Sequence, residues 1–166
     1  MTTGLRDEIA VLVPRLRRFA YALTGSREEG DDLVQSACVK ALDRIDQFEP
    51  GTRLDSWLFT IVRNLFLDDR RRVARRGFHA GDEVLDQLSD QGLAVGQSES
   101  RLRLARVRQA MALLPDEQRE VIALVAIEGH SYREAAEILS LPVGTVMSRL
   151  ARGRTRLLAL EGEVRP

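Results

Sequence analysis

The sequence predicts an all-α protein made of two small helical domains joined by a flexible acidic linker. Apolar residues recur at helical spacing near both ends of the chain. Between them, residues 77–100 contain five acids, four glycines and no lysine or arginine. That composition is typical of a mobile linker. We therefore expect one domain at residues 1–76 and a second at residues 101–166, each small enough that burial alone stabilises it only marginally.

Three apolar stripes predict three helices in the N-terminal domain, and we expect these helices to share one core. In chain order the stripes consist of Ile9, Leu12, Leu16, Phe19, Ala20 and Leu23; of Leu33, Ala37, Cys38, Ala41, Leu42 and Ile45; and of Leu54, Trp57, Leu58, Ile61, Val62 and Leu65. Gly25 ends the first helix. Acids at positions 28, 29, 31 and 32 suit the positive N-terminal end of the second. Cys38 is expected to be a small core residue, with a redox-sensing thiol as the alternative.

The third helix has a basic exposed side. Thr60, Asn64, Arg71 and Arg75 recur there at helical spacing, and the helix ends in two runs, 70–72 and 75–76, that are all arginine. Arginines at a helix C-terminus complement the helix dipole, but this accounts for one or two of them rather than five. A basic helix that also carries an amide predicts a nucleic-acid surface.

Turn residues set the boundaries of a helix-turn-helix in the C-terminal domain. Pro115 and the two acids after it predict the start of a helix near residue 116, and Gly129 predicts its end near residue 128. Ser131 and Glu134 form the capping box of a second, short helix. Pro142 ends that helix, because proline disfavours helical geometry in the residue before it.

The last helix begins near Val143 and divides into two faces. The inner face is expected to hold Val143, Val146, Leu150 and Leu157, and the outer face Thr145, Ser148, Arg149, Arg152 and Arg156. Residues 145–156 include four arginines and no acid, so the local field attracts polyanions. Arginine can fork onto guanine or neutralise phosphate, whereas the plain alternative is a solvated arginine-rich face. The pattern predicts a helix that enters the major groove of DNA.

Composition argues against several other classes of protein. The 25 basic and 25 acidic residues cancel, whereas an autonomous DNA-binding protein of this size is usually basic. No run approaches the ~20 apolar residues of a membrane span and no signal peptide is recognisable, so we expect a cytoplasmic protein. One cysteine cannot form an internal disulfide, and His79 and His130 follow no metal-ligand spacing. Phosphate-binding loops and nucleophile motifs are missing, so we expect no catalytic residue, metal or cofactor.

Three segments match a known family in their order and separation. They are GDDLVQSACVKAL at residues 30–42, FEPGTRLDSWLFTIVRNLFLDDRRR at 48–72, and the helix-turn-helix at 114–158 with its GTVMSRLARGR. Together they resemble regions 2 and 4 of the extracytoplasmic-function (ECF) sigma factors, the sigma-70-type initiation subunits of bacterial RNA polymerase. The resemblance covers nearly the whole chain apart from the linker and the last few residues. It implies a region 2 helical bundle followed by a region 4 helix-turn-helix.

The resemblance implies two roles for the N-terminal domain. Asp31, Asp32 and Gln35 match the part of region 2 that docks on the clamp helices of the largest subunit of the polymerase core. The loop at 48–53 and the helix after it match the surface that captures an unstacked base of the melted −10 promoter element. The implied −10 positions are Phe48, Arg53, Trp57, Thr60, Asn64, Arg71 and Arg75. Trp57 is expected to be mainly a core residue, and Phe48 alternatively only fixes its loop.

For the C-terminal domain the resemblance implies recognition of the −35 promoter element. The implied contacts are Thr145, Ser148, Arg149, Arg152 and Arg156 on the last helix, with Tyr132 and Arg133 as phosphate contacts on the helix before it. Region 4 would also meet the flap of the second-largest polymerase subunit. A linker of 24 residues extends to roughly 80 Å, enough for two DNA turns of about 34 Å each. The implied regulator is an anti-sigma factor that covers both domains.

One residue departs from the family in a way that bears on the last helix. Gly153 stands where the family usually has alanine. Glycine costs up to about 1 kcal/mol in a helix interior relative to alanine. We therefore expect this helix to be less rigid toward its end.

We interpret the chain as an alternative sigma factor that recognises promoters, and two other classes of function remain as alternatives. A freestanding helix-turn-helix regulator would need only the C-terminal half and would leave the N-terminal motifs unexplained. A sigma-mimicking decoy that titrates an anti-sigma factor would share both regions, but the decoys of this family carry an attached receiver domain. An enzyme acting through Asp68, Asp69 and His79 would lack a third ligand and a pocket motif. As a sigma factor the chain would act in a stress response, while the polymerase supplies the chemistry.

Overall fold

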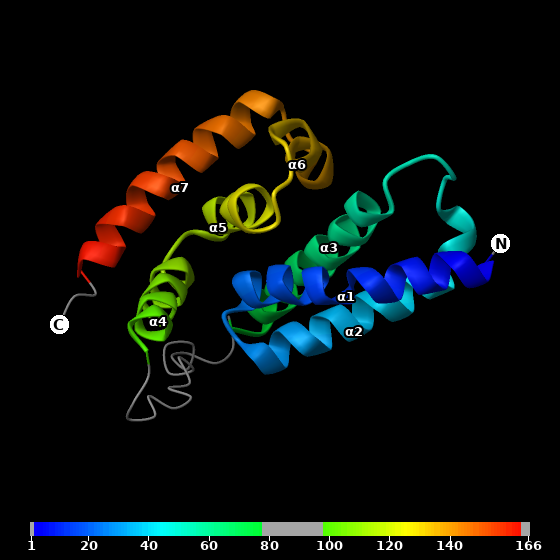
Figure 1. The fold of residues 1–166 in the computed structure, drawn as a ribbon, viewed down its shortest axis with the longest axis horizontal. Coiled ribbons are helices and arrows are strands. Elements are labelled where there is room, and N and C mark those ends of the chain that lie inside the picture. Colours follow the sequence, from blue (N-terminus) through cyan, green and yellow to red (C-terminus); the bar gives the residue numbers. More distant parts are fainter. Residues whose placement is uncertain (1, 78–97, 164–166) are drawn as a thin grey trace.

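The computed structural model describes residues 2–77 and 98–163, and every regular element in these two ranges is a helix (Figure 1). The predicted all-α class is confirmed. The predicted acidic linker at 77–100 falls mostly on residues 78–97, which lie outside the described residues.

Residues 2–77 form the N-terminal domain, with helices α1 (Thr2–Thr24), α2 (Arg27–Asp43) and α3 (Leu54–Gly77) and the 3₁₀ turn η1 (Ile45–Gln47). Gly25 ends α1 as predicted, with a φ of +71°, a left-handed conformation that glycine adopts without strain. Ser26 caps α2, because its hydroxyl oxygen accepts a hydrogen bond from the Glu29 backbone N–H at 3.3 Å. These two residues fix the end of α1 and the start of α2.

The core of this domain is built from the three predicted stripes. Phe19 is fully buried and packs edge-on against Phe59 of α3, with ring centroids 5.1 Å apart. Leu42, in the last turn of α2, differs from the prediction because it is 39% exposed, and four other stripe members are only partly buried, namely Leu12, Cys38, Trp57 and Leu65. Phe59 and Phe66, which no stripe includes, are buried. The buried surface of α3 is therefore wider than its stripe.

Residues 98–163 form the C-terminal domain, with helices α4 (Glu99–Ala112), α5 (Asp116–Ile122), α6 (Tyr132–Leu139) and α7 (Val143–Glu163) and the π-helical turn η2 (Ala123–Ile127). The last three helices match the predicted helix-turn-helix. No prediction corresponds to α4, whose first two residues fall inside the predicted linker. Its leucines stand among arginines rather than in a stripe, and Leu102 and Leu104 are 38% and 49% exposed.

Gly153 corrects the expectation that α7 loosens toward its end. The helix continues to Glu163, and Gly153 is buried against α5. A β-carbon at Gly153 would lie 2.9 Å from Ile122 Cδ1 and 3.3 Å from Gln118 Cβ. Glycine at this position thus permits a close approach of two helices. Val143 also differs from the prediction, since it is 39% exposed at the first position of α7.

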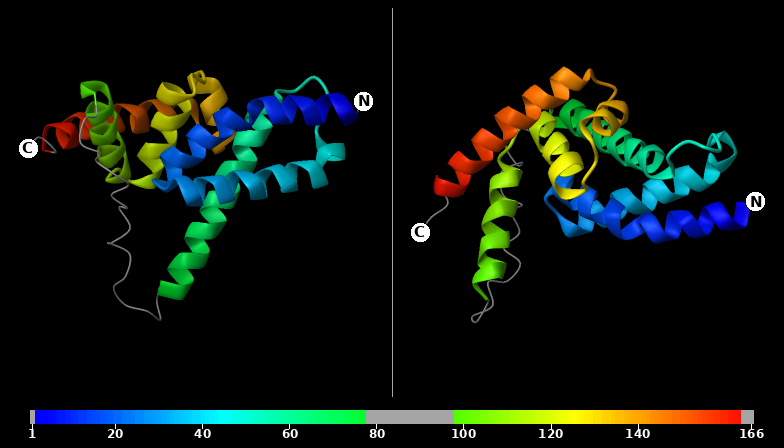
Figure 2. Two further views of the ribbon diagram at one scale, coloured as in Figure 1. Left: turned by 60° about the horizontal axis from the view of Figure 1, so that its bottom comes forward. Right: turned by 45° about the horizontal axis from the view of Figure 1, so that its top comes forward.

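The two domains pack against each other (Figure 2). Helix α1 contacts η2, α4 and α5, and α3 contacts α6. Arg119 of α5 is buried and donates a hydrogen bond of 2.8 Å to the Leu23 carbonyl of the other domain. Its remaining bonds go to the carbonyls of Met111, Ala112 and Leu114. Since its donors have partners, the burial of this guanidinium is compensated.

Candidate nucleic-acid interface

The helix-turn-helix is held by caps at both ends of α6. The Glu134 backbone N–H donates to Ser131 Oγ at 3.1 Å, and the Ser131 N–H donates to Glu134 Oε2 at 3.0 Å, so the predicted capping box is present. Ser140 ends the helix in a left-handed conformation with a φ of 53°. Tyr132 and Arg133 stand in the first turn of α6 and are both exposed.

The outer face of α7 is basic and accessible. On the inner face, Val146 and Leu150 are 0% and 2% exposed. On the outer face, Ser148, Arg152 and Arg156 are exposed. The predicted division of this helix is therefore confirmed at these positions, and no acid lies between residues 145 and 156 to neutralise the arginines.

Thr145 and Arg149 are less accessible than the rest of that face. Thr145 is partly buried, and its carbonyl accepts a hydrogen bond from Ser148 Oγ at 3.1 Å. The side chain of Arg149 is 21% exposed and its Nη2 lies 3.4 Å from Glu117 Oε2 on α5. To reach a base, Arg149 must leave this carboxylate.

Five of the seven predicted −10 residues lie along α3, and Phe48 and Arg53 lie in the segment before it. Asn64, Arg71 and Arg75 are exposed. Arg71 lies 3.6 Å from Asp68 one turn earlier, a weak pairing at a solvated surface. Thr60 is partly buried, and its hydroxyl donates to the backbone carbonyl one turn earlier at 2.8 Å. Among the predicted −10 residues on the basic side of α3, Asn64 thus provides the accessible uncharged polar group.

The loop before α3 is attached to the helix by two aromatic rings. Phe48 and Trp57 are both half-buried, with ring centroids 5.3 Å apart and a tilt of 51°. This contact ties the loop to the helix and leaves part of the Phe48 ring accessible. Gly51 turns the loop with a φ of +91°, which favours glycine.

The predicted polymerase-docking residues lie on α2. Asp31 is partly engaged within the chain, because it accepts the Tyr21 hydroxyl at 2.6 Å and lies 3.4 Å from Arg17. That hydrogen bond raises the pKa of Tyr21. Asp32 and Gln35 are exposed. Gln35 lines a shallow open hollow together with Ser36, Val39, Lys40, Asp43 and Arg44.

Four acids of the C-terminal domain meet arginines of the N-terminal domain, which the sequence analysis did not predict. The pairs are Glu128 with Arg15 and Arg18, Glu120 with Arg63, Glu134 with Arg53, and Asp116 with Arg70. The Glu128 and Glu120 side chains are only 0% and 5% exposed. Acids within the apolar stretch 119–128 were the available signal, since buried charges need partners.

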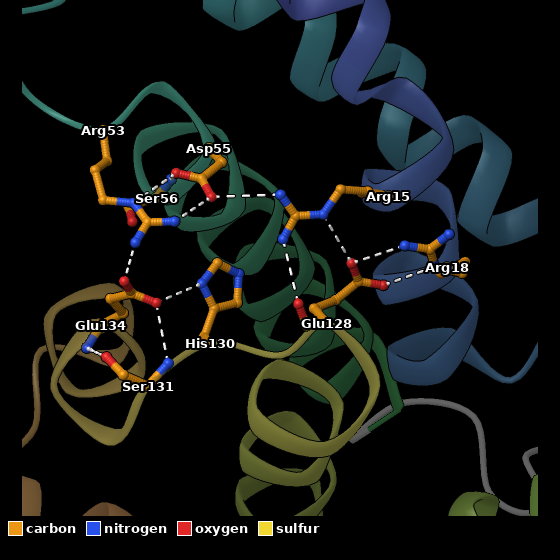
Figure 3. A network of polar contacts seen from close by, with 9 residues as sticks. All are labelled: Arg15, Arg18, Arg53, Asp55, Ser56, Glu128, His130, Ser131 and Glu134. Atoms are coloured by element: carbon orange, nitrogen blue, oxygen red, sulfur yellow. Dashed lines mark hydrogen bonds and ion pairs between the residues drawn. The ribbon is translucent and has the colours of Figure 1, made fainter.

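Glu128 is the most completely bonded of these acids. Arg15 Nε donates to it at 3.2 Å, and Arg18 donates through Nε at 3.0 Å and Nη2 at 3.2 Å (Figure 3). Arg15 Nη2 also donates to the Glu128 backbone carbonyl at 3.3 Å. Charge-assisted bonds of this kind are about twice as strong as neutral ones. The hydrogen bond to Glu128 also raises the pKa of Arg18.

Arg53 is held by acids from both domains. Its Nε and Nη2 donate to the two Asp55 oxygens at 3.1 and 2.7 Å, and its Nη1 donates to Glu134 of α6 (Figure 3). Burial alone would raise the pKa of the Asp55 carboxyl, but the hydrogen bonds from Arg53 and from the Ser56 backbone lower it to about 2. The predicted −10 residue Arg53 is thus occupied by carboxylates.

His130 lies between the two domains. It is 4% exposed and packs edge-on against Phe59 of α3, with ring centroids 4.8 Å apart. Its Nδ1 lies 3.4 Å from Glu134 Oε2, while its Nε2 is buried without a hydrogen-bond partner in the described part of the chain. Burial lowers the pKa of His130.

Within residues 2–77 and 98–163, no three His, Cys, Asp or Glu side chains are grouped so that they could hold a metal ion. No helix in those ranges is long and apolar enough to cross a membrane. Cys38 is half-buried, and burial raises the pKa of its thiol. A raised pKa lowers the thiolate fraction on which cysteine reactivity depends.

Both domains match known protein families. The family described as Sigma-70 region 2 matches residues 9–76, and the family described as Sigma-70, region 4 matches residues 104–157. The ECF RNA polymerase sigma factor EcfG of Rhodopseudomonas palustris is 43% identical to this chain over 160 residues. That match covers 96% of this chain and 86% of the relative.

Solved structures of two sigma factors resemble the whole chain. The sigma factor RpoE of Bartonella quintana, solved in complex with the anti-sigma factor NepR, is 33% identical with a TM-score of 0.84, covering 98% of this chain and 99% of its own. CnrH, solved in complex with the cytosolic domain of CnrY, is 29% identical with a TM-score of 0.73, covering 99% and 92%. Because the first superposition includes both domains with a high score, RpoE shares their relative arrangement.

Proposed function

Since this chain belongs to the extracytoplasmic-function sigma factors of the sigma-70 family, we propose that its two basic faces read the two elements of a promoter. The chain is an alternative sigma factor, a transcription initiation factor that directs RNA polymerase to specific promoters. The observation that carries the proposal is the capped helix-turn-helix whose recognition helix exposes arginines with no acid between residues 145 and 156, in one chain with the basic helix α3.

The −35 element is read by α7 in the major groove. Ser148, Arg152 and Arg156 have the accessibility that this requires. Thr145 and Arg149 complete the reading face, with Arg149 exchanging Glu117 for a base or a phosphate. Tyr132 and Arg133 contact phosphates beside the groove and set the register of the helix.

The −10 element is captured after melting by α3 and the loop before it. Asn64 has donors and an acceptor for a base edge. Along the path of the melted DNA strand it is flanked by Thr60, Arg71 and Arg75. Arg53 binds the backbone once it is released from Glu134. Phe48 and Trp57 form the aromatic contact that supports the loop. A flipped base stacks against the exposed edge of this aromatic pair.

The polymerase supplies the nucleotidyl-transfer chemistry, and this chain contributes no catalytic group. Asp32 and Gln35, together with Asp31, dock on the clamp helices of the largest subunit through the exposed edge of α2. The C-terminal domain meets the flap of the second-largest subunit. The chain works in the cytoplasm, where its polymerase is, and acts in a stress response.

An anti-sigma factor is the regulator of this chain. The solved relatives RpoE and CnrH are complexes with NepR and with the cytosolic domain of CnrY, and the former complex is an anti-sigma complex. A protein of that kind would cover the docking edge of α2 and the reading faces of α3 and α7. Removal of the regulator then releases both domains for the polymerase.

Run-off transcription with purified core polymerase and a genomic promoter pool tests the proposal. Arg152→Ala should cost roughly 1–3 kcal/mol in promoter binding and relax preference at one base pair, whereas Arg133→Ala should weaken all promoters alike. Arg154→Ala is the matched control, because Arg154 is exposed on the same helix but stands outside the reading face.

Equal losses for Arg152→Ala and Arg154→Ala would remove the reading face as assigned. A wild-type chain that binds NepR-like regulators but never supports transcription would instead favour the decoy. Promoter-specific shifts without polymerase would favour the freestanding regulator.

A further inference from the structure

We propose that one edge of α7 reads thymine through its C5-methyl group, beside the arginines that read polar base edges. This apolar edge consists of Val143, Met147 and Ala151, which are exposed and recur every four residues, so they lie on one side of the helix. The inference rests on the proposed function, because it concerns which bases of the −35 element the same helix selects.

The first step is that the apolar edge lies in the part of α7 that enters DNA. Helix α7 begins at Val143, so Met147 stands in its second turn. In a helix-turn-helix the N-terminal residues of the recognition helix contact the base edges. Met147 is 51% exposed and Val143 is 39% exposed. Both side chains are therefore accessible in the segment that meets the bases.

The second step is that the apolar edge and the arginines occupy opposite sides of the reading face. Successive residues of an α-helix are rotated by about 100° around its axis. Met147 is therefore rotated by about 140° from Arg152 and by about 160° from Arg149. Ser148 lies between the two sides, and Arg149 lies beside Glu117 of α5. The reading face is thus divided, with charge along one edge and apolar carbon along the other.

The third step is that thymine has the chemistry that matches the apolar edge. In the major groove the bases present hydrogen-bond donors, hydrogen-bond acceptors and one apolar group, the C5-methyl of thymine. Against a donor, an acceptor or a phosphate, the Met147 side chain would remove a polar group from water without bonding it. Against a methyl group, the same contact removes apolar surface of both partners from water. The flexible thioether chain of methionine also adapts to the position of that methyl group.

The spacing of the apolar edge indicates how much of the promoter it covers. Met147 and Ala151 are separated by about 6 Å along the helix axis, and successive bases of one DNA strand are about 3.4 Å apart. The two side chains therefore reach methyl groups separated by about two base-pair steps. We expect roughly two thymines of the −35 element in contact with this edge, displaced from the base that Arg152 reads.

Deoxyuridine provides the test, because uracil lacks only the methyl group and keeps the hydrogen-bonding groups of thymine. The full-length chain is combined with core polymerase and a promoter that it transcribes. Each thymine on either strand of the −35 element is then replaced in turn by deoxyuridine. Competition binding measures the affinity of the holoenzyme for each duplex. We expect a loss of about three- to fivefold for each methyl group that the apolar edge covers.

Met147→Ala should lose a similar factor on the thymine promoter and should bind the thymine and uracil duplexes equally at the position that Met147 covers. Because Met147 is half exposed, this change should leave the melting temperature of the protein nearly unaltered. Met147→Leu should restore the discrimination, since leucine supplies a similar apolar surface. Arg152→Ala should keep it, because Arg152 reads the other side of the groove.

Leu158→Ala is the matched control. It removes an apolar side chain that is 69% exposed on the same helix, about three turns beyond Met147 and away from the end that enters the groove. This variant should distinguish thymine from uracil as well as the wild-type chain does.

Three results would overturn thymine reading by the apolar edge. They are a wild-type holoenzyme that uracil weakens at no position of the −35 element, a Met147→Ala variant that discriminates as wild type does, and a Met147→Ala variant that loses affinity for core polymerase instead of promoter DNA. In each case the wild-type chain still transcribes, so the proposed function stands. A chain that supports transcription from no promoter would overturn the proposed function and this inference with it.

Discussion

At the scale of single residues, Asn64 separates a reading role from a structural one. Its side chain is exposed on α3, so its loss should barely change folding stability. Asn64→Ala should impair open-complex formation more than initial promoter binding, because the −10 element is read after melting. Permanganate footprinting of thymines measures the melted region, and a melting curve of the protein serves as the control.

A promoter with a pre-melted bubble sharpens that experiment. It should restore part of the strand opening lost in Asn64→Ala but none of the lost base preference. Normal footprints combined with a lowered melting temperature would make Asn64 a structural residue instead.

His130 should make stability depend on pH. The charged groups that face it are Asp55, Glu128, Glu134, Arg15 and Arg53. Burial dominates and lowers the pKa of His130 below its ordinary value of 6.5, so the unfolded chain binds the proton more tightly. The free energy of unfolding should therefore fall as pH decreases from about 7 to about 5.

Denaturant titrations at a series of pH values measure this dependence. His130→Gln should flatten the curve in that range. A curve that keeps its slope in His130→Gln would assign the pH dependence to other groups.

At the scale of elements, the packing of α5 on α7 depends on the missing side chain at Gly153. Gly153→Ala gains helix propensity of about 1 kcal/mol but crowds Ile122 and Gln118, and overpacking costs about 1–3 kcal/mol. We expect a net loss of about 1 kcal/mol in the free energy of unfolding.

Gly162→Ala is the matched control in the same helix, because nothing lies within 4 Å of a β-carbon there. This change should stabilise the protein by up to about 1 kcal/mol. Equal gains in the free energy of unfolding from both substitutions would show that the contact between α5 and α7 has space for a methyl group at position 153. Thermal or denaturant unfolding of the two variants provides the comparison.

The sequence predicts elements well where local signals agree. Gly25, Ser131 with Glu134, and Pro142 each have a local conformational reason to end or begin a helix, and the structure places boundaries there. Helix α4 has no such signal, because Leu102 and Leu104 are set among arginines and remain largely exposed. Gly153 was misjudged because helix propensity is local, whereas its role depends on a neighbouring helix.

At the scale of the whole molecule, the buried ion pairs of Glu120 and Glu128 with arginines of the N-terminal domain should make the two domains unfold together. Calorimetry of the wild-type chain should give one transition whose calorimetric and van't Hoff enthalpies agree. Removing one partner of a buried ion pair costs about 3–5 kcal/mol. Glu120→Gln/Glu128→Gln should therefore split the transition in two, while the control Asp7→Asn/Glu8→Gln, which removes two exposed charges of α1, should keep one. Two transitions in wild type would contradict the coupling.

The candidate site was predictable only in part, because sequence signals are local whereas some of its contacts join different domains. Spacing along one helix places Arg152 and Arg156 on a common face, because both positions belong to a single regular element. No spacing rule relates Arg53 to Glu134 or Arg63 to Glu120, which belong to different domains. The sequence can indicate that a buried acid such as Glu120 needs a cation, but many arginines are available to it. Which arginine serves is decided by tertiary packing.

The π-helical turn at the end of α5 has an evolutionary consequence. The Glu128 N–H bonds the Ala123 carbonyl five residues earlier, so this turn contains one residue more than an α-turn. The wider turn absorbs that extra residue, so a chain with one residue fewer here would form a regular α-turn and still direct Glu128 toward Arg15 and Arg18. Lineages should therefore be able to gain or lose a residue at this turn without losing the contact between the domains.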